Sequence, residues 1–156
     1  MKWLGLLILV PALLIVGTLV LNRPPLFGPP GPVARLKAYL TTNVAETSPG
    51  NVRPELRTRT YPLGEEALQA AVLTAMKKVG WRDVRVGPAG IQAVAVTPLL
   101  GFRDDVTVRL SPIGRGQTRL DARSASRIGR GDLAANERHL LDLFDALPAP
   151  AHAGGG

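Results

Sequence analysis

The sequence predicts an α+β fold, in which an antiparallel sheet of about four to five strands is covered by two helices and preceded by one transmembrane helix. Three observations lead to this prediction. An uncharged apolar run, residues 3–21, opens the chain. Two later stretches, residues 65–79 and 132–147, repeat apolar residues at helical spacing. Between them, apolar and polar residues alternate as they do in half-buried strands.

The uncharged run at residues 3–21 contains 19 residues. At about 1.5 Å per residue, a helix of that length nearly matches a hydrocarbon core of about 30 Å. Pro11 lies inside the run, and lipid tolerates such a kink because neighbouring groups satisfy the freed carbonyl. A cleaved signal peptide is the alternative, but its apolar core is about 7 to 15 residues long and ends at a small-x-small site. This run is longer and has no such site, so we predict an uncleaved anchor over residues 1–21.

The orientation of this anchor depends on the charges at its two flanks. Lys2 and the amino terminus compete with Arg23, Arg35 and Lys37 on the other side. Positive charges are retained on the cytoplasmic side of a membrane. The balance therefore leans slightly toward a cytoplasmic domain.

Residues 22–52 are predicted to be a Pro/Gly-rich linker and loop. Five prolines and two glycines lie within residues 22–32, a composition typical of a stiff, extended spacer that lifts a domain off the membrane. Residues 33–40 can add a short helix, and residues 41–54 have the composition of a loop. The globular domain is then predicted over residues 53–147.

The first amphipathic helix of that domain is predicted over residues 65–79, with acidic residues in its first turn and Gly80 as its stop. Met76 lies on its apolar stripe and is interpreted as core filler. A hairpin follows, with a first strand around residues 84–86 and a second over residues 91–97.

The next two strands, residues 104–110 and 117–127, are joined by a turn at residues 111–116. Their alternating patterns fit one antiparallel register, in which Val106 lies opposite Ala122. That register places every apolar partner on one face of the hairpin.

The same register makes the other face of the hairpin a ladder of charges. It sets Asp105 opposite Arg123, and Thr107 opposite Asp121. We therefore expect Asp105 and Arg123 to form an ion pair on a charged sheet face.

The second amphipathic helix is predicted to be capped by Asp132, to cover the sheet and to end at Pro148. His139 is expected at its surface, on the side away from the apolar residues. The last residues, 148–156, are predicted to be a disordered tail that holds His152.

The composition excludes several kinds of site. The chain contains no cysteine, so it has no disulfide, thiolate metal site, lipidated cysteine or cysteine nucleophile. Its 19 Lys and Arg residues against 12 Asp and Glu residues give a net charge of +7, which attracts anionic lipid, polysaccharide or nucleic acid alike. Aromatic residues make up only 4%, so few side chains can stack on bases, and nucleic acid is the least favoured of these partners.

Two strings of the chain, GFRDDVTVRL (101–110) and ARSASRIGRGDLAANERHLLDLF (122–144), resemble domain-of-unknown-function family 1499 of bacteria and plastids. The resemblance covers roughly residues 53–147. Many members have a cysteine-containing segment ahead of the domain, which this chain lacks. The family-like pattern is carried here by Ser126, Arg127, Gly129, Asp132, Leu133 and Asn136.

This resemblance implies a location rather than a reaction, because no activity is established for the family. Many of its members look exported, which favours a periplasmic domain over the slight lean of the flanking charges. We therefore expect a single-pass protein of the bacterial inner membrane, anchored by residues 1–21, with its domain in the periplasm.

Catalytic chemistry is not favoured by the sequence. Asp104 and Asp105 are neighbours on a strand and point to opposite faces, so they cannot serve one bond as acid and base. Ser124 and Ser126 have no histidine in the pattern that could activate them. His139 lacks a metal-ligand partner. We predict no catalytic residue, metal site or cofactor.

The remaining candidate site is the turn from Arg127 to Asn136, where two glycines lead into the start of a helix. Such a corner can bind an anion, but its polar residues can equally satisfy the loop itself, which is the favoured interpretation. Arg127, Asn136 and Glu137 are expected to form one polar cluster. The candidate residues for an anion-binding, partner-binding or structural role are Asp105, Arg123, Arg127, Asn136 and Glu137.

Two functions follow from these observations. The favoured one is a non-catalytic, membrane-anchored binding or scaffold module, whose arginine-rich sheet face meets anionic lipid, polysaccharide or an envelope protein. The alternative is an unrecognised enzyme with a site near the turn from Arg127 to Asn136.

Overall fold

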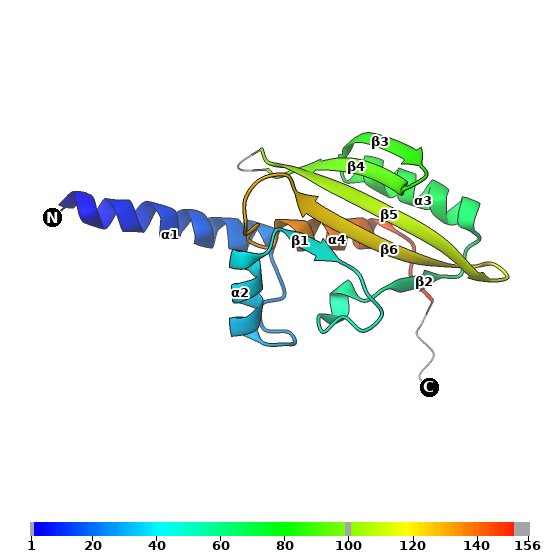
Figure 1. Cartoon of the computed structure of the whole chain (residues 1–156), viewed down its shortest axis with the longest axis horizontal. Helices are drawn as coiled ribbons and strands as arrows, with labels where there is room; N and C mark the ends of the chain where they lie inside the picture. Colours follow the sequence, from blue (N-terminus) through cyan, green and yellow to red (C-terminus); the bar gives the residue numbers. More distant parts are fainter. Residues whose placement is uncertain (1, 99–100, 152–156) are drawn as a thin grey trace.

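The computed structural model describes residues 2–98 and 101–151, and within the first helix it describes side chains at Leu7 and from Leu9 onward. A six-stranded antiparallel sheet forms the centre of the domain, and a long amino-terminal helix projects from one end of it (Figure 1). The predicted α+β class is confirmed, with six strands in place of four to five. No helix within these described residues is long and apolar enough to cross a membrane.

The elements follow one another in a simple order, and neighbouring strands of the sheet run β1-β6-β5-β4-β3, with β2 also paired to β6. Helices and strands have the bounds α1 Lys2–Asn22, α2 Pro32–Thr41, β1 Val44–Glu46, β2 Arg59–Tyr61, α3 Glu65–Lys78, β3 Arg82–Gly87, β4 Gly90–Val96, β5 Arg103–Gly114, β6 Gln117–Ser126 and α4 Ala135–Ala146, with a short 3-10 helix at Pro54–Leu56.

The core lies between one face of the sheet and the two helices α3 and α4 (Figure 1). Leu68 and Met76 of α3, Leu140 of α4 and Val106 of β5 are completely buried there. Each such side chain contributes about 1.5 to 3 kcal/mol through its removal from water. Met76 is thus core filler, as predicted. No helix of the described residues covers the opposite face of the sheet (Figure 1).

The predicted register of the β5–β6 hairpin is wrong by two residues. Val108 lies opposite Ala122, and Asp105 lies opposite Ala125 rather than Arg123. The cause is the turn, because β5 continues to Gly114 through a bulge and only two residues separate the strands, whereas a six-residue turn was expected. A shift of two residues keeps every side chain on its face. The predicted division into an apolar and a charged face therefore holds.

The extended spacer predicted over residues 22–32 is also wrong. Successive backbone hydrogen bonds fold this segment into turns, for example from Gly28 N–H to the Pro25 carbonyl at 3.0 Å. The side chain of Asn22, the last residue of α1, donates to the Leu133 carbonyl at 2.7 Å. The end of α1 is therefore fastened to the domain instead of being held away from it.

The stretch predicted as linker and loop contains two elements of the domain. The short helix expected at residues 33–40 is present as α2. β1 lies in the predicted loop and pairs with β6, with Ala45 opposite Ser124. Sequence patterns missed β1 because a strand of three residues is too short to alternate visibly.

The two ends of α4 differ from expectation in detail. The helix begins at Ala135, after Leu133 and Ala134 adopt left-handed φ angles of 51° and 68°. Asp132 still caps it, since its carboxylate accepts hydrogen bonds from the N–H groups of Ala134 and Asn136, both at 3.0 Å. Beyond the helix, residues 152–156 of the predicted tail, including His152, lie outside the described residues.

Candidate functional site

The sheet face that no helix covers is the first candidate site, and we call it the open face. Because side chains alternate along each strand, every second residue of β4, β5 and β6 points to it. Seven arginines and four carboxylates lie there: Arg82, Arg85, Arg103, Arg109, Arg119, Arg123, Arg127, Glu46, Asp83, Asp105 and Asp121.

Asp105 and Arg127 form the shortest ion pair of the open face among the described residues. Arg127 Nη2 lies 2.6 Å from Asp105 Oδ1, and Arg127 Nε lies 3.0 Å from Asp105 Oδ2. Such a two-pronged contact is the geometry that a guanidinium favours with a carboxylate. Hydrogen bonds from Arg127 hold the pKa of Asp105 below its ordinary value.

Arg123 does not belong to that pair. Its Nε lies 3.8 Å from Glu46 Oε2 on β1, and both side chains are more than half exposed. The predicted Asp105–Arg123 ion pair is therefore wrong, and the register shift explains why. Arg85 and Arg109 bond neutral oxygens instead, those of Gln92 and the Ala89 backbone.

Asn136 is a buried hydrogen-bond hub on the other side of the sheet. Its side-chain oxygen accepts from Ser124 Oγ at 2.6 Å, and its Nδ2 lies 2.9 Å from the Asn43 carbonyl. The same Nδ2 also lies within 2.8 Å of Ser126 Oγ and 2.6 Å of Asp132 Oδ2. Asn136 thus ties α4 to β6, to the residue before β1 and to its own capping turn. Burial raises the pKa of Asp132 although the start of α4 donates hydrogen bonds to it.

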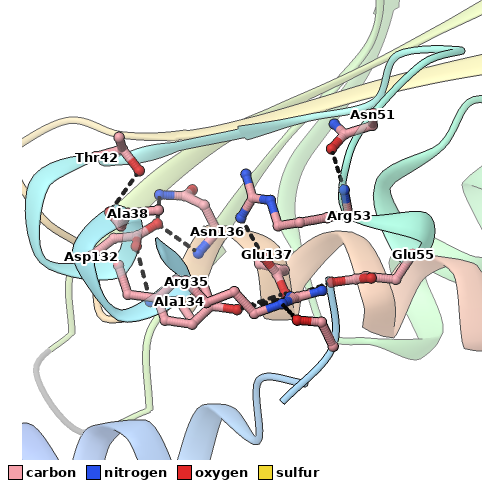
Figure 2. A network of polar contacts seen from close by, with 12 residues as sticks. Arg35, Ala38, Thr42, Asn51, Arg53, Glu55, Asp132, Ala134, Asn136 and Glu137 are labelled. Atoms are coloured by element: carbon pink, nitrogen blue, oxygen red, sulfur yellow. Dashed lines mark hydrogen bonds and ion pairs between the residues drawn. The ribbon is translucent and has the colours of Figure 1, made fainter. Parts of the chain in front are cut away.

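Glu137, the next residue of α4, is only 2% exposed and binds a different set of partners. Arg53 Nη1 lies 2.5 Å from its Oε2, and the Tyr39 hydroxyl lies 3.1 Å from its Oε1. Arg35 Nη1 is shared between Glu137 Oε1 at 3.4 Å and Glu55 Oε1 at 2.5 Å. Figure 2 shows Glu137 directed toward Arg35 and Arg53, and Asn136 directed toward Asp132.

The charges of this Glu137 network sum to zero, because two arginines face two glutamates. Burial is the largest influence on Glu137 and raises its pKa, whereas Arg53 and Arg35 act in the opposite direction. Burial would also raise the pKa of Glu55, but the hydrogen bond from Arg35 and the other contacts of that carboxylate outweigh burial and lower it. A neutral, mutually paired set of this kind has no net charge to attract an external anion, and removal of one member would leave a buried charge without its partner.

The five candidate residues therefore fall into separate places. The prediction that Arg127, Asn136 and Glu137 form one cluster is wrong. Arg127 ends its strand on the open face, whereas the first turn of α4 directs Asn136 and Glu137 to two different buried sets. Adjacent helical residues point about 100° apart, which separates the last two.

His139 is a further correction, since it is 8% exposed and not a surface residue. Its Nε2 lies 2.9 Å from Asp104 Oδ2, and its ring meets Trp81 edge-on with 6.3 Å between ring centroids. Asp104 is completely buried, and its Oδ1 has no hydrogen-bond partner among the described residues. As predicted, Asp104 and Asp105 point to opposite faces. Within the described residues no three metal-binding side chains converge on one point.

An apolar cavity of about 260 Å³ lies where α1 meets the domain. Leu21 of α1 lines it on one side, and Phe102, Ile128 and Leu133 line it on the other. The family-like turn borders this cavity. Two polar side chains that line it, Ser126 and Asp132, already bond to Asn136.

Sequence patterns missed several members of these buried sets. Arg35 and Tyr39 lie four residues apart on α2, a spacing that places them on one side of the helix, and this was the signal available for them. Arg53 and Glu55 show no spacing in the sequence that would link them to these residues.

Comparison with known protein families gives a match over most of the chain. The family described as a protein of unknown function (DUF1499) matches residues 32–147. No curated protein matches the chain. The match begins at the first residue of α2 and ends one residue after α4.

Proposed function

This chain belongs to the DUF1499 family of proteins of unknown function, and we propose from its own geometry that it is a membrane-anchored, non-catalytic binding module. In this proposal α1 holds the protein in the bacterial inner membrane. The open face then presents its charged residues to a partner protein in the cell envelope.

The anchor is supported by the surface of α1. Its described side chains are apolar all round, and Leu7, Leu13 and Val20 are 71%, 61% and 66% exposed. A helix without a polar side has no stable place in water. The hydroxyl of Thr18, within α1, donates to the Leu14 carbonyl at 2.8 Å. Helices that face lipid satisfy their hydroxyl groups in the same way. Together with the 19 uncharged residues of the sequence, these features favour insertion.

The anchor is tested by extraction of membranes from cells that express the full chain. Alkaline carbonate should leave the protein in the membrane, and its amino-terminal sequence should begin before α1. Release by carbonate, or a mature amino terminus near Arg23, would contradict the proposal. Protease added to spheroplasts tests the location of the domain, which we propose to be periplasmic and therefore accessible.

The observation that carries the binding function is the open face itself. A sheet is normally either covered on both faces or exposed to water on one face, and that exposed face then carries scattered polar residues. Here one solvated face gathers seven arginines among four carboxylates. Arginine is enriched where proteins bind one another, because its fork makes directed hydrogen bonds at low desolvation cost.

The mixture of charge signs on the open face favours a protein over an anionic polymer or lipid. An acidic polysaccharide needs a surface of one sign, whereas alternating signs complement a partner that also alternates. Anionic lipid or polysaccharide remains the alternative ligand for this face. An enzyme near the turn from Arg127 to Asn136 is less favoured, because the polar groups of that turn bond to one another.

A photo-crosslinking residue in place of Thr107, at the middle of the open face, tests this function in the full chain. The control carries the same residue in place of Lys77, which is exposed on α3. We expect one envelope protein to be captured from Thr107 only, and to be lost when Arg109→Glu and Arg123→Glu are added. Equal capture from both positions, or capture that survives charge reversal, contradicts the proposal. Salt-sensitive binding of an acidic polysaccharide instead would identify the alternative.

A further inference from the structure

Helix α2 turns its polar side inward and its apolar side outward. Arg35 and Tyr39 are only 1% and 2% exposed, because the Glu137 network holds them. Val33, Leu36 and Leu40 are 83%, 37% and 45% exposed. Their spacing of three and four residues places them on one side of the helix. A helix on the surface of a globular domain normally turns its apolar side to the core and its polar side to water.

Other exposed apolar side chains gather near α2, around the end of α1. Phe27 is 86% exposed in the short connection between the two helices. Phe102 and Ile128 are 47% and 74% exposed, and both line the cavity against Leu21 of α1. We call these six residues the apolar patch: Phe27, Val33, Leu36, Leu40, Phe102 and Ile128.

The loop that carries Ile128 is packed tightly against α2. A Cβ atom on Gly131 would lie 2.3 Å from the Leu40 carbonyl oxygen, so only glycine fits there. Leu133 N–H donates to the Tyr39 carbonyl at 3.0 Å. The parts of the apolar patch on α2 and on this loop therefore belong to one surface. Helix α2 runs across the carboxyl end of α1 (Figure 1).

The exposed charges beside the apolar patch are basic. Arg23 follows α1, Lys37 lies on the outer side of α2, and Arg130 lies two residues after Ile128. Asp132, the acid in this loop, directs its carboxylate to the backbone at the start of α4. Apolar side chains flanked by cations are the combination that binds an anionic lipid surface.

The joint between α1 and the domain holds the apolar patch in position. Asn22 is clamped to Leu133, and Arg35 Nε donates to the Gly28 carbonyl in the connection at 3.0 Å. The domain therefore cannot swing away from the end of α1 without breaking these partly buried hydrogen bonds. A bilayer that contains α1 would end beside the apolar patch.

We propose that the apolar patch is a second membrane contact, with α2 lying in the surface of a bilayer that contains anionic phospholipid. This inference rests on the proposed insertion of α1 and adds to it. The domain then sits directly on the lipid, and its open face has a defined direction relative to the membrane.

Single cysteines test the contact in the full chain, since the protein has no cysteine of its own. The variants Val33→Cys and Ile128→Cys place a fluorophore in the apolar patch. Leu13→Cys reports on α1, and Ile113→Cys is an exposed apolar control near the β5–β6 turn, at the opposite end of the domain (Figure 1). Each protein is reconstituted into phosphatidylcholine vesicles with and without phosphatidylglycerol, and circular dichroism verifies its fold. Quenching by lipids with a nitroxide near the headgroup is then measured at Val33, Ile128 and Ile113, and quenching by lipids with a nitroxide near the end of the acyl chain is measured at Leu13, which lies near the middle of α1.

We expect several-fold stronger quenching at Val33 and Ile128 than at Ile113, and more with phosphatidylglycerol than without it. Replacing Arg23, Lys37 and Arg130 by glutamine should remove that lipid dependence. Quenching at Leu13 with none above the control at the apolar patch would overturn this inference and leave the anchor standing. No quenching at Leu13 would overturn the anchor as well. Labels that are shielded from aqueous iodide but not quenched by lipid would indicate a protein on the apolar patch, which also contradicts the inference.

Discussion

Two adjacent side chains at the start of α4 connect most of the parts that the sheet alone does not hold. Asn136 reaches β6 and the residue before β1, whereas Glu137 reaches α2 and the segment that contains Arg53. Both residues are nearly or completely buried, so each group that they bond would lose its partner if they were truncated. Their role is to fix the position of the family-like turn.

Truncation of Asn136 should therefore be costly. Asn136→Ala leaves the buried Ser124 and the partly buried Ser126 and Asp132 without their shared partner, and an unsatisfied buried group costs about 1 to 3 kcal/mol. We expect the free energy of unfolding, measured by urea denaturation in detergent, to fall by about 3 kcal/mol or more. The matched control is Arg123→Ala on the open face, where an exposed pair contributes about 0 to 1 kcal/mol. Equal losses in both variants would contradict this role.

The pKa of Asp105 distinguishes the observed register from the predicted one. Because Arg127 holds this pKa below its ordinary value of 3.8, Arg127→Ala should raise it, and Arg123→Ala should leave it unchanged. A lowered pKa stabilises the fold above pH 3.8, and that contribution is lost as the pH falls through the folded-state value. Carboxyl chemical shifts followed by NMR titration measure both effects. A rise in the Arg123 variant instead would support the register predicted from sequence.

The sequence identifies polar residues that will be buried and will need hydrogen-bond partners, but it does not identify those partners. Asn136 and Glu137 fall within the apolar arc of their helix, which indicates burial and a need for partners. Arg35 and Arg53 lie 102 and 84 residues away from Glu137, and no local pattern links positions so distant. His139 was misassigned for the same reason, since Asp104 lies 35 residues before it.

At the scale of elements, α2 behaves as part of the domain rather than of a linker. Its inner side supplies Arg35 and Tyr39 to the Glu137 network, and its carboxyl end receives hydrogen bonds from the loop before α4. No residue of α2 belongs to the hydrophobic core of the domain, so we expect these polar bonds to hold the helix in place.

The loss of Arg35 should consequently release α2. Arg35→Ala leaves Glu55 and Glu137 short of a buried cation, and breaking a buried pair by removing one partner costs about 3 to 5 kcal/mol. Lys37→Ala, on the exposed side of the same helix, is the control and should change stability little. Urea denaturation measures the loss, and protease cleavage within α2 should become faster in the Arg35 variant only. A small effect would mean that α2 is held by other contacts.

Strands and helices with long periodic patterns were predictable, and their exact pairing was not. Alternation assigned the faces of β5 and β6, because a period of two depends only on the local sequence. Their register depends on the turn, and Pro112 with Gly114 forms a bulge that alternation does not reveal. β1 and β2, each of three residues, carry too little pattern to be recognised.

At the scale of the molecule, three described surfaces face in different directions. The helices α3 and α4 cover one face of the sheet, the open face points away from them, and the apolar patch lies at the end from which α1 projects (Figure 1). Because the Asn22 side chain bonds the end of α1 to the Leu133 carbonyl of the domain, the orientation of α1 fixes the orientation of the other surfaces. A membrane at the apolar patch would leave the open face accessible to a neighbouring protein.

The boundary of the folded unit follows from this organisation and can be tested by truncation. A chain that begins at Pro32 keeps α2, β1 and all four charged members of the Glu137 network, and it should fold as a monomer with a cooperative urea transition. A chain that begins at Arg53, the boundary predicted from sequence, loses β1 from the edge of β6 and leaves Glu137 without Arg35 and Tyr39. We expect this shorter chain to be insoluble or partly unfolded by circular dichroism and amide-proton NMR dispersion. Adding back residues 32–52 should restore the fold, whereas equal folding of both chains would place α2 and β1 outside the cooperative unit.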